Sequence, residues 1–136
     1  MMNNYNQFSE DVNNNANKFE LEKDAYNSFI KGNTFKNLYS QYKNYRPFDI
    51  NPQNEKDYGL LLIQIYGFVA HDLGLFLDVY PNNDEIIKLR EKYINLYNQA
   101  VMNYEQKYGP LSLDSNMLGA IPWSWDSNNF PWEVRE

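Results

Sequence analysis

Two stretches in the middle of the chain carry apolar residues at helical spacing. In residues 55–79 apolar side chains recur every three or four positions, at Tyr58, Leu61, Leu62, Ile65, Phe68, Val69, Phe76 and Leu77. This spacing fits a helix of about 3.6 residues per turn and does not fit the two-residue alternation of a strand. Asn54 is a candidate N-cap, and Pro81 prevents the helix from continuing. The pattern predicts one long helix.

A second apolar stripe follows Pro81 directly. Asn82 or Asn83 can cap a helix there, and Gly109 followed by Pro110 is typical of a helix end. Because the connection is short, the two helices should pair antiparallel over residues 54–110. The expected core of this hairpin is Leu61, Leu62, Ile65, Phe68, Val69, Phe76, Leu77, Ile87, Ile94, Tyr97, Val101 and Tyr104.

The expected fold class is all-α: an antiparallel two-helix hairpin with extended, aromatic-rich N- and C-terminal arms. Two helices bury only one seam, and a core of this size rarely supplies more than about 3–5 kcal/mol. We therefore expect oligomerisation or a partner to complete the fold.

The N-terminal arm, residues 1–53, begins with an Asn-rich segment and then becomes aromatic. Gly32 and Asn33 predict a turn. After it, Phe35, Leu38, Tyr39 and Tyr42 can line one side of a short helix. The alternative is a flexible leader, although disordered leaders seldom contain so many aromatic residues.

The C-terminal arm, residues 111–136, is expected to be a loop, and all three tryptophans lie in it. They occur in two Pro-Trp segments, Pro122-Trp123-Ser124-Trp125 and Pro131-Trp132. Large rings on a pre-extended backbone suit docking into a groove of a partner. The arm can equally fold back and cover the exposed stripe of the hairpin, and the sequence leaves both alternatives open.

Composition excludes several classes of protein. The 136-residue chain is one domain in size and has a formal net charge of −6, which argues against nucleic-acid binding and against docking on an anionic membrane. The longest purely aliphatic run, 60–63, is far too short to span a bilayer, and the first residues lack the pattern of a secretory signal. We therefore expect no membrane insertion.

Catalytic chemistry has little support in the sequence. There is no cysteine, and the single histidine, His71, is followed by Asp72. Such a pair is more often a structural hydrogen bond than a proton shuttle. No zinc spacing, phosphate-binding loop or nucleophile elbow occurs. We expect no metal, no cofactor and no enzymatic activity.

Residues 58–132 resemble the spore coat protein JB family. The resemblance rests on the order and spacing of four stretches: 68–81 (FVAHDLGLFLDVYP), 104–111 (YEQKYGPL), 122–125 (PWSW) and 131–132 (PW). Tyr80 stands where the family usually has histidine, so a role for that histidine does not carry over to this chain.

The leader resembles the short JA coat proteins over residues 32–42 (GNTFKNLYSQY), with Gln41 in place of the usual proline. The chain would then combine a JA-like docking peptide with a JB-like hairpin. The residues expected to contact partners are Phe29, Gly32, Phe35, Leu38, Tyr39, Tyr42, Pro122, Trp123, Trp125, Pro131 and Trp132.

The resemblance implies a structural component of the bacterial endospore coat. It implies synthesis in the mother-cell cytoplasm, assembly into the coat, and partnership with the JC coat protein, which is similar to manganese catalases. Other coat proteins, and a second copy of the chain, are further expected partners. An alternative function is binding of glycan or peptidoglycan through the C-terminal tryptophans.

Overall fold

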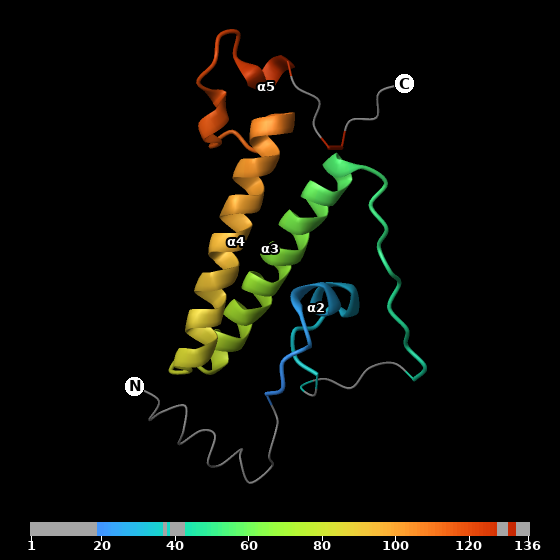
Figure 1. Ribbon diagram of the computed structural model, residues 1–136. Coiled ribbons are helices and arrows are strands. Elements are labelled where there is room, and N and C mark those ends of the chain that lie inside the picture. The colour runs from blue at the N-terminus through green and yellow to red at the C-terminus, as the bar shows by residue number, and fades with distance from the viewer. Residues whose placement is uncertain (1–18, 37, 39–42, 128–130, 133–136) are drawn as a thin grey trace.

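The computed structural model describes residues 19–36, 38, 43–127 and 131–132. Its elements, in chain order, are α2 (Ala25–Lys31), α3 (Glu55–Val79), α4 (Asp84–Tyr108), the 3-10 helix η1 (Asn116–Leu118) and α5 (Ser124–Ser127). Figure 1 shows α3 between its two neighbours, with α4 on one side and α2 on the other. The described residues form no β-sheet, and only an isolated bridge joins Leu21 to Phe35.

The helical hairpin predicted from the sequence is confirmed. Helices α3 and α4 are 25 residues each and pack antiparallel around a short turn. The side chain of Asn54 accepts a hydrogen bond from the backbone N–H of Asp57 at 2.8 Å. Asn83, not Asn82, caps α4, because its side chain accepts from the N–H of Ile86 at 3.2 Å. These amides satisfy backbone donors that a helix start leaves unpaired.

The hairpin core consists of two clusters. Near the turn, Val69, Leu73 and Phe76 of α3 pack with Ile86 of α4 and with Phe35 of the leader. Toward the open end, the buried residues are Ile63, Ala100 and Tyr104. The leader thus supplies part of the core that two helices alone would lack.

The predicted core needs correction at Ile87 and Tyr97, each of which is 37% exposed. Leader segments cover α3 from a second side, whereas the main helix–helix packing of α4 in the described part of the chain is with α3. Apolar residues at the edge of the α4 stripe therefore stay in solvent. Leu73 and Ile86 are buried although they are not among the predicted core residues. Five of the predicted core residues are half-buried: Leu62, Phe68, Leu77, Ile94 and Val101.

The short helix predicted after Gly32 is wrong at Phe35, because the helix precedes that glycine. Asp24 caps α2 by accepting from the N–H of Asn27 at 2.8 Å, and Gly32, at φ +76°, ends it in the left-handed region. Phe35 then lies in the bridge with Leu21, flanked by Glu22 N–H to Thr34 O and Lys36 N–H to Glu20 O bonds, both 2.8 Å. Tyr39 and Tyr42 lie outside the described residues.

The C-terminal arm contains more structure than the predicted loop. Ser115 caps η1, and the hydroxyl of Ser124, at the start of α5, donates to the carbonyl of Met117 at 3.0 Å. Figure 1 places this arm at the open end of the hairpin, away from the turn.

By length and composition alone, α3 is long and apolar enough to cross a membrane. The longest uninterrupted aliphatic run, 60–63, is only a small part of this helix. The test is weak evidence for a membrane span, because the core helix of a soluble protein also passes it.

Candidate protein-binding surfaces

The leader is attached to α3 mainly through aromatic rings. Phe35 stacks on Phe76 with ring centroids 4.7 Å apart, and Phe19 meets the same ring edge-on at 5.0 Å. Phe29 contacts Phe68 edge-on at 5.9 Å. Phe35 is only 2% exposed, so its expected role as a partner contact is wrong in this structure. Its ring is part of the chain's own core.

A carboxylate fixes the leader beside these rings. Asp72 of α3 accepts a hydrogen bond from the backbone N–H of Thr34 at 2.9 Å. Asn33 holds the same turn, since its side chain accepts from the N–H of Phe35 at 2.9 Å. Asp72 therefore has a structural role, whereas the neighbouring His71 is exposed. No local pattern predicts this contact, because Thr34 and Asp72 are 38 residues apart.

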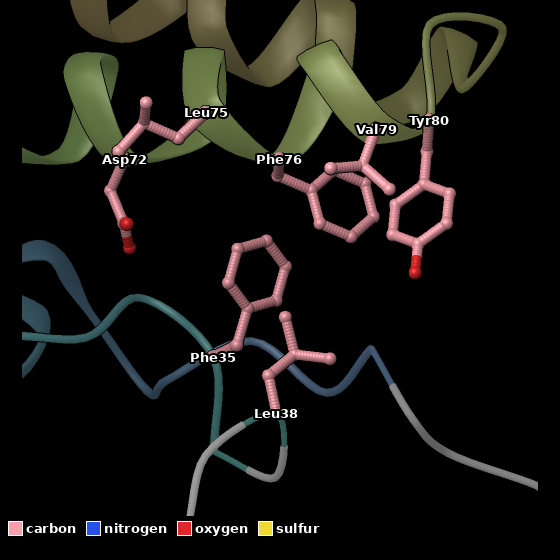
Figure 2. Close-up of a pocket in the computed structure, with 7 residues that line it drawn as sticks. All are labelled: Phe35, Leu38, Asp72, Leu75, Phe76, Val79 and Tyr80. Atoms are coloured by element: carbon pink, nitrogen blue, oxygen red, sulfur yellow. The ribbon is translucent and has the colours of Figure 1, made fainter.

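An apolar groove of about 290 Å³ lies where the leader meets the second half of α3. Figure 2 shows its lining, with the rings of Phe35 and Phe76 facing each other and Leu38 and Tyr80 beside them. Leu75 and Val79 also line this groove, and both are exposed although they are aliphatic.

A second hollow, of about 430 Å³, lies on the other flank of Leu75. Its lining comes from α3 except for Arg90, which crosses from α4 and donates from Nε to the carbonyl of Ala70 at 3.2 Å. Gly74 leaves room for this crossing, because a Cβ there would lie 3.2 Å from the Arg90 Nε. The lining residues are His71, Gly74, Leu75, Leu77, Asp78 and Arg90.

The C-terminal arm exposes two of its three tryptophans. Trp123 is 51% and Trp132 is 64% exposed, and Pro122 beside them is also in solvent. Trp125 and Pro131 are half-buried. At least half of each of the Trp123 and Trp132 side chains is therefore in solvent.

The remaining predicted contact residues lie in the leader. Gly32 is exposed at its turn, and Phe29 and Leu38 are half-buried against α3 and the core near the turn. The predicted contact residues in the described part of the chain therefore form two groups. Those of the leader pack on the hairpin near its turn, and those of the C-terminal arm lie at the open end of the hairpin.

A small apolar pocket of about 140 Å³ lies at the open end of the hairpin, where Tyr104 and Tyr108 are neighbours. The buried hydroxyl of Tyr104 has no hydrogen-bond partner among the residues that the structure describes, and burial raises the pKa of this tyrosine. On the rim, Lys107 donates to Glu55 at 2.7 Å, which lowers the pKa of the Glu55 carboxyl.

Within residues 19–36, 38, 43–127 and 131–132, no three histidine or acidic side chains come together as a metal site. The described surfaces offer apolar rings and hollows, which occur at contacts between proteins.

Comparison with known proteins gives one match. A family model described as "CotJB protein" matches residues 57–133, which include nearly all of α3, the whole of α4 and the tryptophan-bearing arm. No curated protein and no solved structure matches the chain.

Proposed function

The chain belongs to the CotJB family of spore coat proteins, and from this premise we propose that it is a non-enzymatic structural component that assembles with other coat proteins. The observation that carries the proposal is the exposure of Trp123 and Trp132 inside the family-matched region. Buried aromatic anchors dominate many protein interfaces, so exposed tryptophan rings are suited to that role.

The proposed partner is a coat protein similar to manganese catalases, the JC type. The resemblance to the JB family motivates this choice, and the tryptophan arm supplies the contact surface. The proposed route is synthesis in the mother-cell cytoplasm followed by assembly on the forespore.

The proposed organisation has three parts: a leader over 1–53, the hairpin over 54–110 and the arm over 111–136. The leader's JA-like stretch packs on its own hairpin through Phe35, so in this organisation it completes the core. The C-terminal arm is the part that we propose contacts the partner.

The double variant Trp123→Ala, Trp132→Ala tests the proposal. In sporulating cells, a fluorescent fusion of this variant should fail to reach the coat. Each truncated anchor can cost about 2 kcal/mol or more, which is roughly thirtyfold in affinity. A matched control is Phe48→Ala in the linker before α3, since Phe48 is equally an exposed ring but lies outside the matched region.

A pull-down identifies the partner. The purified chain should retain the catalase-like coat protein and lose it in the double variant. Retention on insoluble peptidoglycan instead would replace this proposal by glycan binding, and full recruitment of the double variant would show that the arm does not bind the coat.

A further inference from the structure

One face of α3 remains open between α4 and the leader. Its exposed residues are His71, Leu75, Asp78 and Val79, spaced at i, i+4, i+7 and i+8. Residues at this spacing form a single stripe along a helix. Leu75 is 52% exposed and Val79 is exposed as well, so the stripe has an apolar centre with a histidine near one end and a carboxylate near the other.

The hollow beside Leu75 has the geometry that receives a side chain of another helix. His71, Gly74, Leu75 and Asp78 surround it at i, i+3, i+4 and i+7. This is the four-residue hole into which a side chain from a facing helix inserts in knobs-into-holes packing. Gly74 contributes no side chain to the lining, and Arg90, which crosses over Gly74, lines the side toward α4.

The charges select the occupant and its direction. His71 lies four residues before Leu75, and Asp78 lies three residues after it. In an antiparallel pair of α3 helices with a two-fold axis between Gly74 and Leu75, His71 of each copy therefore faces Asp78 of the other. The imidazole can donate an N–H to that carboxylate in either protonation state. A parallel pair would instead bring Asp78 against Asp78.

We propose that this stripe is a homodimer surface, in which Leu75 of each copy fills the hollow over Gly74 of the other. The contact is isologous, as is usual for dimers, because the same patch serves both chains. It lies on the half of α3 near the turn, apart from the tryptophan arm. Both surfaces can therefore be occupied at once.

The chain has no cysteine, so single introduced thiols report this geometry directly. Leu75→Cys should give a disulfide-linked dimer on oxidation, because the two copies of residue 75 lie about 1.5 Å apart along the axis. Val79→Cys should not, since its two copies are separated by roughly 13 Å along the axis. Equal cross-linking at both positions would indicate a parallel pair and overturn the proposal, as would absence of cross-linking at Leu75→Cys.

Sedimentation equilibrium of the full chain, from about 1 μM to about 1 mM, tests the charge pairing. The wild type should dimerise, and His71→Asp should weaken the dimer at least about tenfold by opposing carboxylates. The exchange His71→Asp with Asp78→His should restore it. A dimer insensitive to the single change, or a double variant no stronger than the single one, would overturn the pairing.

Leu75→Glu and Met102→Glu form a matched pair, since the two wild-type residues are 52% and 51% exposed. Only Leu75→Glu should dissociate the dimer, and far-ultraviolet circular dichroism should show both variants folded. A wild-type chain that stays monomeric over the whole range would overturn the proposal. Loss of coat recruitment without loss of dimerisation would instead count only against the proposed function.

Discussion

At the scale of single residues, neighbouring leucines in α3 have opposite environments. Leu73 is fully buried among the leader and both long helices, whereas Leu75, two positions later, is half in solvent. Two residues rotate a helix by about 200°, so one position faces the core and the other faces away. Residue type alone does not separate them, and packing decides which one stabilises the fold.

Leu73→Ala should therefore lower the free energy of unfolding by about 2–5 kcal/mol, the usual cost of a cavity in a packed core. Met102→Ala, at an exposed position of α4, should change it by no more than about 0.5 kcal/mol. Chemical denaturation followed by circular dichroism measures both. Equal effects of the two substitutions would contradict the core described near the turn.

Tyr104→Phe should stabilise the chain by roughly 1 kcal/mol, because it removes a buried hydroxyl for which the described part of the chain supplies no hydrogen-bond partner. It should also change the response to alkali. Burial raises the folded-state pKa of Tyr104 above the ordinary value of 10.0, so the stability linked to its neutral form is intact below about pH 10. That stability is lost as the pH rises through the folded-state pKa.

Melting temperatures of the wild type and of Tyr104→Phe, measured between neutral pH and pH 11, test this loss of stability in alkali, with Tyr93→Phe as the comparison. Burial raises the pKa of Tyr93 too, so that variant should also lose part of the alkaline sensitivity. Destabilisation of Tyr104→Phe at neutral pH would mean that its hydroxyl has a partner.

At the scale of elements, the leader acts as a third layer on α3. It contributes α2, the Leu21–Phe35 bridge and the Phe35 ring, and it is held by a backbone bond to Asp72. The last part of the leader, residues 43–53, is exposed throughout and contacts α2 through Tyr26, whose hydroxyl donates to Asp49 at 3.1 Å. The docking of the leader on α3 therefore depends on the contacts of its earlier residues, such as Phe35 and Thr34.

Phe35→Ala should loosen the leader while α3 and α4 stay paired, because the buried ring that stacks on Phe76 at 4.7 Å disappears. Hydrogen exchange should show loss of protection in α2 and at residues 33–36, and little change in α4. Phe48→Ala, at an exposed ring, is the matched control. Unchanged protection in Phe35→Ala would contradict the leader's role in the core.

At the scale of the whole molecule, three surfaces have different roles in the structure and in the two proposals. The leader completes the core near the turn, the stripe around Leu75 is assigned to a second copy, and the tryptophan arm is assigned to the coat. Trp123 and Trp132 are exposed, so the double alanine variant should keep the wild-type melting temperature. A clear drop would mean that the arm stabilises the hairpin and would weaken the recruitment test.

The purified chain should contain no stoichiometric manganese or iron and should show no catalase or peroxidase activity. The reason is that the described residues bring no three metal-binding side chains together. Elemental analysis and a peroxide-consumption assay check this. Manganese bound at one ion per chain would require a site that this arrangement does not contain.

The sequence by itself determined the hairpin. Helical spacing, the Asn54 cap, Pro81 and the Gly109-Pro110 end are local features, and α3 and α4 have the bounds that these features predict. The family resemblance was likewise carried by short motifs in fixed order, and the match over residues 57–133 confirms it. Local signals are enough for both, because helix limits and motifs depend on residues close in sequence.

Only the tertiary structure decided how the leader and the apolar surplus are arranged. Phe35 was predicted to meet a partner and is instead buried on Phe76, and Ile87 and Tyr97 were predicted to be buried and are exposed. These outcomes depend on contacts between segments tens of residues apart, such as Thr34 with Asp72. A stripe of apolar residues predicts that one face of a helix is buried. Which segment buries that face depends on which surfaces come into contact when the chain folds.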